Sequence, residues 1–284
     1  MKNNIVAKLI KGFIIGSSML VPGVSGGTMA IILGIYDELI HAVSTFKENM
    51  KANGILLVQY GLAGVLGVIL LSGPMLAAVT LWNKPMMFLF LGAIIGSIPP
   101  LYKKATVFKM KPINIGSMFV GFLIAYLITL FPEGMLDFNG DSMLISMAIL
   151  FIAGIFIAIA FVLPGISASY VLLMLGIYNL TLMAIKSMDL LFLMPLTIGV
   201  LAGTFLTAGI LEREMNIHPQ FTYMLIIGFM LGSLIEVFPG LPGGMAIMPC
   251  IVTFASGFGV IYSVGRDNGK RLAIGGSEAC LTKD

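Results

Sequence analysis

Long apolar stretches separated by short polar turns run through most of the 284-residue chain. Proline and glycine interrupt two of them: residues 21–28 read VPGVSGGT and residues 163–170 read LPGISASY. Because proline lacks an amide hydrogen and glycine tolerates positive φ, each stretch is predicted to break a helix in its middle. Each is followed, at the same spacing, by Leu-Gly-Ile-Tyr, at 33–36 and at 175–178. The pattern predicts a duplicated chain built around two broken helices.

The other apolar stretches divide the chain into two similar halves. A first repeat is predicted over 1–132 and a second over 143–264, followed by a tail at 265–284. In each repeat a broken hairpin precedes three helices of about 20 residues, the length that crosses a bilayer. The predicted elements are hairpin 12–46 and helices 55–81, 86–101 and 113–131, then hairpin 143–185 and helices 190–211, 221–238 and 245–264. This is the pattern of an all-α, polytopic membrane protein.

Composition agrees with a location in the bilayer. Hydrophobic residues make up 58% of the chain and charged residues 10%, and the mean hydropathy is +1.05. A soluble domain would carry roughly 25% charged residues. The low share of charged residues therefore excludes an ordinary soluble protein. The net charge of +3 is small, so no nucleic-acid partner is expected.

The distribution of Lys and Arg indicates how the hairpins run. If each hairpin enters and leaves on one side, all of the 16 Lys and Arg except Lys84 and Lys186 share a side with both termini. If each crossed once instead, the lysines of 103–111 would lie outside, against the positive-inside rule. Re-entrant hairpins and hairpins that cross twice satisfy the rule equally. Either way each half crosses an odd number of times, which predicts an inverted repeat, as in secondary transporters, with both termini cytoplasmic.

Small residues recur in the later helices of both halves. Residues 92–97 read GAIIGS and residues 228–233 read GFMLGS, with glycine at i and i+4. Such glycines let helices approach closely in lipid. We interpret both stretches as packing seams.

The helix that follows each break begins with unpaired amide groups, and hydroxyl side chains lie beside them. Two helix starts that approach from opposite faces would bind an anion, particularly a phosphate. The candidate phosphate-binding residues are Gly23, Ser25, Gly26, Gly27, Thr28, Gly165, Ser167, Ser169 and Tyr170. The alternative for Ser25 or Ser167 is that each only caps its own helix.

Few carboxylates lie near the apolar segments. Asp37, Glu38 and Glu236 are the candidates to bind a coupling proton or cation, because carboxylates within a membrane are commonly functional. The alternative is that the first two lie at a solvated helix end and the third at the interface. No acidic or histidine cluster has the spacing of a metal site or a phosphatase, so no metal, cofactor or catalytic residue is expected.

The two Pro-Gly-x-Ser motifs and the two Leu-Gly-Ile-Tyr runs resemble the bacterial polyprenyl-phosphate transporter family, over nearly the whole chain. The resemblance implies a flippase in the bacterial plasma membrane. It would return undecaprenyl phosphate, a lipid carrier of cell-wall (peptidoglycan) precursors, from the outer to the inner leaflet. The phosphate would cross through the polar centre while the isoprenoid tail stays in lipid.

Two other classes of function remain open from the residues alone. A secondary transporter of a small soluble anion could use the same helix starts, without a lateral opening to lipid. A membrane enzyme acting on lipid phosphates is the other alternative. The sequence does not determine the oligomeric state or the coupling ion.

Overall fold

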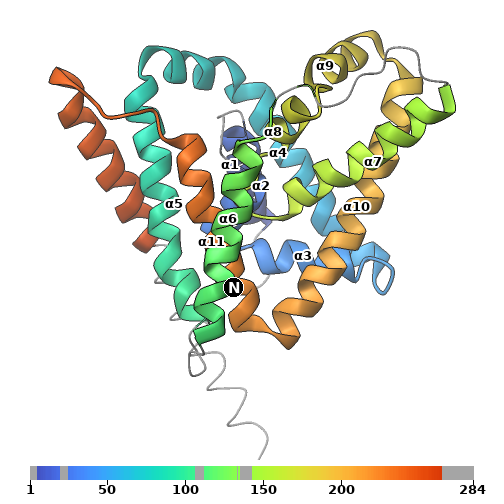
Figure 1. The fold of residues 1–284 in the computed structure, drawn as a ribbon, viewed down its shortest axis with the longest axis horizontal. Helices are drawn as coiled ribbons and strands as arrows, with labels where there is room; N and C mark the ends of the chain where they lie inside the picture. Colours follow the sequence, from blue (N-terminus) through green and yellow to red (C-terminus); the bar gives the residue numbers. More distant parts are fainter. Residues whose placement is uncertain (1–4, 20–24, 106–111, 133, 135–142, 264–284) are drawn as a thin grey trace, which may run out of the picture.

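The computed structural model describes residues 5–19, 25–105, 112–132, 134 and 143–263. Within these ranges every regular element is a helix (Figure 1). In chain order the helices are α1 Ile5–Ser18, α2 Gly26–Ile32, α3 Tyr36–Ser44, α4 Met50–Leu81, α5 Asn83–Ala105, α6 Pro112–Thr129, α7 Met143–Val162, α8 Ala168–Met174, α9 Tyr178–Ser187, α10 Leu190–Ile217 and α11 Pro219–Val237. A last helix, Gly244–Ser263, begins with a 3-10 turn and carries no label in Figure 1. The all-helical fold class is confirmed.

Six of the described helices are long and apolar enough to cross a membrane, namely α4, α5, α7, α10, α11 and the last helix. The longest, α4, has 32 residues, which corresponds to about 48 Å against roughly 30 Å of hydrocarbon. The shorter apolar helices α8 and α9 form a pair bent by 105°. The protein is therefore a multi-pass membrane protein.

The third helix after each hairpin packs against the other half. Helix α6 lies along α11, and the last helix lies along α5. A Cβ built at Gly228 would lie 2.1 Å from the carbonyl oxygen of Met118, and one built at Gly92 would lie 2.1 Å from that of Phe254. The two contacts join positions that correspond in the two predicted repeats, because Gly92 and Gly228, and Met118 and Phe254, are each 136 residues apart. The seams predicted at 92–97 and 228–233 do contact a neighbouring helix.

The first helix of each hairpin packs within its own half. Helix α1 runs along α4, and α7 runs along α10. Glycines form both seams: a Cβ at Gly16 would lie 2.0 Å from the carbonyl oxygen of Gly64, and one at Gly199 would lie 2.1 Å from that of Phe151. These close approaches fix where the broken end of each hairpin points.

The repeated Leu-Gly-Ile-Tyr run ends the short helix after each break. Gly34 and Gly176 have φ of 67° and 78°, the left-handed conformation that glycine adopts without strain. The amides of Ile35 and Ile177 then donate to carbonyl oxygens five residues earlier, over 2.9 and 3.0 Å. This is the Schellman arrangement of a helix C-terminus. It turns the chain from α2 into α3, and from α8 into α9.

Two apolar core clusters flank the breaks. Met29 of α2, Ile94 of α5 and Met230 of α11 belong to the first cluster. Ile177 and Phe229 belong to the second, which is formed mainly by α7, α8 and α10. Neighbouring residues of α11 thus enter both clusters, and the two hairpins meet beside this helix.

The two hairpins differ in what their outer helices contact. Helix α3 packs against both α4 and α10. Helix α9 contacts α8 and α10, and within the described residues it has no comparable contact with α4. In Figure 1, α9 and the turn between α4 and α5 both lie at the top of the molecule, on opposite sides of the view, and α3 lies in its lower half.

Candidate functional site

Each break ends in a serine that caps the following short helix. Ser25 has an extended backbone, and its Oγ accepts a hydrogen bond of 3.1 Å from the amide of Thr28. Ser167 has nearly the same backbone angles, and its Oγ accepts one of 3.4 Å from the amide of Tyr170. Both serines therefore act as N-caps, as one of the alternatives drawn from the sequence stated.

The two breaks contact each other directly. The amide of Gly165 donates to Thr28 Oγ1 over 2.9 Å and to Ser25 Oγ over 3.3 Å. The hydroxyls of Ser25 and Thr28 also bond to each other, over 2.8 Å. Both side chains are buried, with exposed fractions of 4% and 1%. Hydroxyls of the first hairpin thus satisfy a backbone group of the second.

Gly165 makes this close contact sterically feasible. Its φ is +85°, and a Cβ there would lie 2.4 Å from the carbonyl oxygen of Phe229 on α11. Gly27, on the other hairpin, faces the backbone of Pro164 at 3.3 Å by the same measure. Small residues on both sides therefore bring the breaks together next to α11.

Tyr36, the last residue of the first Leu-Gly-Ile-Tyr run, links the hairpins a second time. Its hydroxyl donates to the carbonyl oxygen of Val162 over 2.9 Å, and the side chain is 4% exposed. That carbonyl lies at the end of α7, where the helix has no amide to offer it. Tyr36 was noted in the sequence as a repeated residue, but its role at the site was missed.

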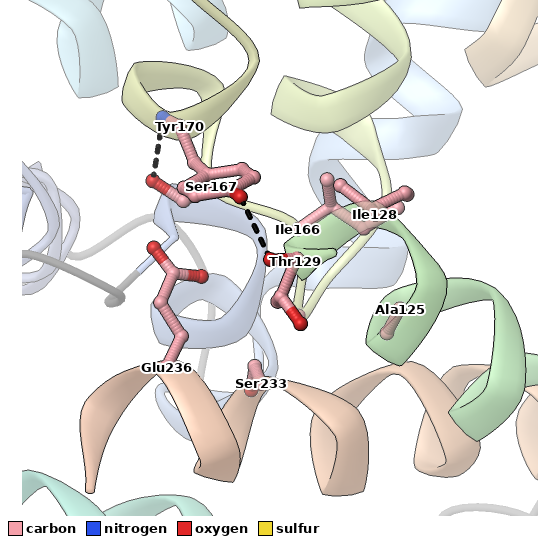
Figure 2. A pocket seen from close by; sticks show the side chains of 9 residues that line it. Ala125, Ile128, Thr129, Ile166, Ser167, Tyr170, Ser233 and Glu236 are labelled. Atoms are coloured by element: carbon pink, nitrogen blue, oxygen red, sulfur yellow. Dashed lines mark hydrogen bonds between the residues drawn. The ribbon is translucent and has the colours of Figure 1, made fainter. Parts of the chain in front are cut away.

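A small pocket lies beside the second break (Figure 2). Its lining residues are Ala125, Ile128 and Thr129 of α6, Gly165, Ile166, Ser167 and Tyr170 of the second hairpin, and Ser233 and Glu236 of α11. Figure 2 shows the Glu236 carboxylate extending toward Ser167. The hydroxyl of Tyr170 donates to the carbonyl oxygen of Thr129 over 3.0 Å. The pocket thus combines a carboxylate with hydroxyl groups from three parts of the chain.

The other predicted phosphate-binding residues have varied positions. Gly23 lies outside the described residues. Gly26 and Gly27 form the first turn of α2. Ser169 is exposed on α8 and does not line the pocket. Phosphate binding by any of these residues stays a prediction.

Asp37 and Glu38 lie away from the pocket, at the start of α3. Glu38 pairs with Lys8 of α1 over 3.1 Å and accepts a hydrogen bond of 3.2 Å from the Tyr60 hydroxyl of α4. Asp37 accepts from the Tyr223 hydroxyl of α11 over 3.5 Å. These two carboxylates therefore tie α3 to three neighbouring helices.

A further polar contact holds the other end of α3. His41 contacts Glu212 of α10 through its Nδ1. Among the described residues, no three His, Cys, Asp or Glu side chains come together as a metal site would require. Sequence reasoning missed Tyr60, Thr129 and Tyr223, since a single polar residue in an apolar helix does not reveal its partner.

Taken together, the spans and the two joined breaks define a multi-pass membrane protein whose interrupted helices meet inside the fold. A family described as VCA0040-like, undecaprenyl phosphate translocase-like, matches residues 15–243. The chain belongs to this family. The resemblance drawn from the repeated motifs is thereby confirmed.

Two relatives cover most of the chain. One, named polyprenyl-phosphate transporter, from Staphylococcus aureus, is 35% identical over 272 residues, which are 91% of this chain and 95% of the relative. Another with the same name, from Vibrio cholerae, is 30% identical over 254 residues, which are 83% of this chain and 78% of the relative. No solved structure matches the chain.

Proposed function

We propose that this protein transports polyprenyl phosphate across the membrane, with undecaprenyl phosphate as its substrate and the bacterial plasma membrane as its location. Family membership and the names of both relatives support this function. The observation that carries it is the buried contact between the breaks, where the Gly165 amide meets the hydroxyls of Ser25 and Thr28. Neutral donors gathered within an apolar protein are what a phosphate needs in place of water.

In this proposal the joined breaks are the closed form of the phosphate site. The Gly165 amide and the hydroxyls of Ser25 and Thr28 now satisfy one another. When the breaks separate, the Gly165 amide loses both of its acceptors, while Ser25 and Thr28 stay bonded to each other on their own hairpin. A phosphate oxygen can then accept a hydrogen bond from this amide. Leaving a buried donor unpaired costs about 1–3 kcal/mol, so separation is favoured when the phosphate replaces the lost bonds.

The isoprenoid tail would remain in lipid while the headgroup passes the breaks. Since a tail cannot enter a closed protein shell, the route requires a lateral opening between helices. The difference between α3, which contacts α4 and α10, and α9, which has no comparable contact with α4 in the described residues, supports such an opening on the α9 side.

The direction proposed is from the outer to the inner leaflet, in a chain arranged as an inverted repeat. Both termini, α3 and the turn between α10 and α11 would be cytoplasmic, and α9 and the turn between α4 and α5 would face outward. Moving a negative charge inward against a negative-inside potential costs about 2.3 kcal/mol per charge per 100 mV. A proton or cation should therefore accompany the lipid, with Asp37, Glu38 and Glu236 as candidates to bind it.

Reconstitution in liposomes tests the function. Purified protein should accelerate the transbilayer movement of labelled undecaprenyl phosphate and leave the flux of soluble inorganic phosphate at the level of protein-free vesicles. Movement of soluble phosphate alone would contradict the proposal and favour the soluble-anion alternative. Hydrolysis of the lipid phosphate, followed in the same vesicles, would identify an enzyme instead.

A further inference from the structure

Glu236 differs from the other acidic candidates in its surroundings. Asp37 and Glu38 have hydrogen-bond or ion-pair partners on neighbouring helices. Among the described residues that line its pocket, Glu236 is the only carboxylate, and no lining residue carries a positive charge. An ionised carboxylate in such a place lacks the partner that would offset its desolvation.

The hydroxyls of the pocket have mostly committed their protons elsewhere. Ser233 and Thr129 each donate to the carbonyl oxygen three residues earlier, over 2.8 and 2.7 Å. Tyr170 donates to the carbonyl oxygen of Thr129 over 3.0 Å. These hydroxyls can offer only lone pairs to the pocket, so they suit a group that donates a hydrogen bond.

Ser167 is the exception among these hydroxyls. Its Oγ accepts from the Tyr170 amide, and in the described part of the chain its own proton has no assigned acceptor. Figure 2 shows the Glu236 carboxylate directed toward it. The Ser167 hydroxyl can donate a hydrogen bond to Glu236 whether its carboxyl group is protonated or ionised. The remaining hydroxyls can only accept, so they favour the protonated form.

We propose that Glu236 binds the proton that accompanies the lipid phosphate. Resting on the proposed function, this inference names the coupling ion and its site. Glu236 takes up a proton where the pocket faces the outside, and its neutral form admits the phosphate to the neighbouring break. The proton leaves on the cytoplasmic side, which restores the carboxylate. An ionised Glu236 beside Ser167 would repel the phosphate instead.

A proton suits the pocket better than a metal cation. A dehydrated metal ion needs a full shell of oxygen ligands. Here Ala125, Ile128 and Ile166 make much of the lining apolar. The carboxyl group needs only one bound proton and one acceptor.

Other titratable groups around the pocket are few. Tyr170 of α8 is the other titratable side chain in the lining. The described titratable side chains of α11 itself and of the helices packed against it lie outside the lining, namely Tyr223 of α11, Tyr126 of α6, Lys84, Tyr102 and Lys103 of α5, and Glu212, Arg213 and Glu214 of α10. The pH dependence of coupling is therefore assigned to Glu236.

The test uses the full chain in vesicles that contain labelled undecaprenyl phosphate. With an alkaline lumen, wild-type protein should enrich the lipid in the inner leaflet severalfold and carry protons inward, reported by a trapped pH dye. Glu236→Gln, which resembles the protonated carboxyl, should still let the lipid equilibrate but give a leaflet ratio near one. Glu48→Gln, on the exposed turn after α3, is the matched control and should behave as wild type.

The outcomes separate this inference from the proposed function. If wild-type protein moves no lipid, the function itself is wrong. If it moves lipid at a rate indifferent to the pH gradient, or responds only to a sodium gradient, the function stands and proton coupling at Glu236 is overturned. Gradient-driven enrichment by Glu236→Gln would overturn it as well. Should Glu236→Gln fail to fold, Glu236→Asp decides: a shifted pH midpoint of transport supports the proposal, and an unchanged midpoint contradicts it.

Discussion

Gly165 shows how much the contact between the breaks depends on a single residue. Its amide donates to two hydroxyls, its φ is +85°, and its α-carbon faces a backbone carbonyl of α11. An added methyl group meets two separate obstacles here, backbone strain and a collision. Because the collision is with backbone rather than a flexible side chain, only movement of the whole break or of α11 relieves it.

Gly165→Ala should therefore destabilise the protein by more than the strain of a positive φ alone, which is about 1–3 kcal/mol. Gly240→Ala is the matched control, because Gly240 has φ of +81° and no atom within 4 Å of an added Cβ. Thermal unfolding in detergent measures both variants. Equal losses of thermal stability in the two variants would show that the backbone of α11 does not collide with a Cβ at position 165.

Ser25 and Ser167 allow the capping role to be separated from the contact between hairpins. Ser25→Ala removes a cap, worth about 0.5–2 kcal/mol, and also an acceptor for the Gly165 amide. Ser167→Ala removes a cap and a pocket hydroxyl next to Glu236, but no hydrogen bond between the two breaks. We expect the first variant to unfold at the lower temperature and to transport lipid more slowly. The reverse order would mean that the contact adds nothing to stability.

The sequence indicated the caps but not their second partners. A serine after Pro-Gly-x and before an apolar run predicts an N-cap from local chemistry alone. That Thr28 would meet Gly165 depends on how two distant hairpins pack, and no local pattern encodes it. Glu236 was likewise conspicuous as a carboxylate in an apolar helix, yet only the fold places it in one pocket with Ser167.

At the scale of the elements, α3 and α9 begin with the same motif and have different surroundings. The Leu-Gly-Ile-Tyr run correctly indicated a turn in both hairpins, because glycine at a helix C-terminus acts through local geometry. It could not indicate that α3 is held by polar contacts to α1, α4, α10 and α11. In α9, Asn179 and Leu180 stand at the positions of Asp37 and Glu38. The sequence therefore shows that the two helices differ in charge, but it does not show which contacts the charges of α3 form.

A double-mutant cycle on Lys8 and Glu38 measures how firmly α3 is held to α1. The pair is 3.1 Å apart, and Glu38 is 41% exposed, so solvent weakens the attraction. We expect a coupling energy below about 1 kcal/mol from thermal unfolding of Lys8→Met, Glu38→Gln and the double variant. A coupling of several kcal/mol would indicate that this ion pair holds α3 firmly against α1.

At the scale of the whole molecule, the inverted repeat makes a clear prediction about sidedness. Lys47 and Lys186 are exposed and lie just after α3 and at the end of α9. In a chain whose Cys250 and Cys280 are replaced by alanine, a cysteine at position 47 should react with an impermeant thiol reagent only from the cytoplasm. A cysteine at position 186 should react only from outside.

Labelling of both cysteines from the same side would contradict the inverted repeat. The charge pattern alone could not distinguish a re-entrant hairpin from one that crosses twice, because both place the lysines identically. A cysteine in place of Ser25, which is buried in the contact between the breaks, tests whether the hairpin is re-entrant or crosses twice. Re-entrant hairpins predict that it is protected from both sides unless lipid phosphate is supplied.

The exchange of helices between the halves also bears on how the protein is made. The seam of α5 at Gly92 is completed by the last helix, near Phe254. During translation the first half therefore waits in the membrane with one glycine face uncovered until nearly the whole chain has left the ribosome. A nascent chain that stops before Gly244 has α6 and α5 packed against α11, but the glycine face of α5 at Gly92 is left open to lipid.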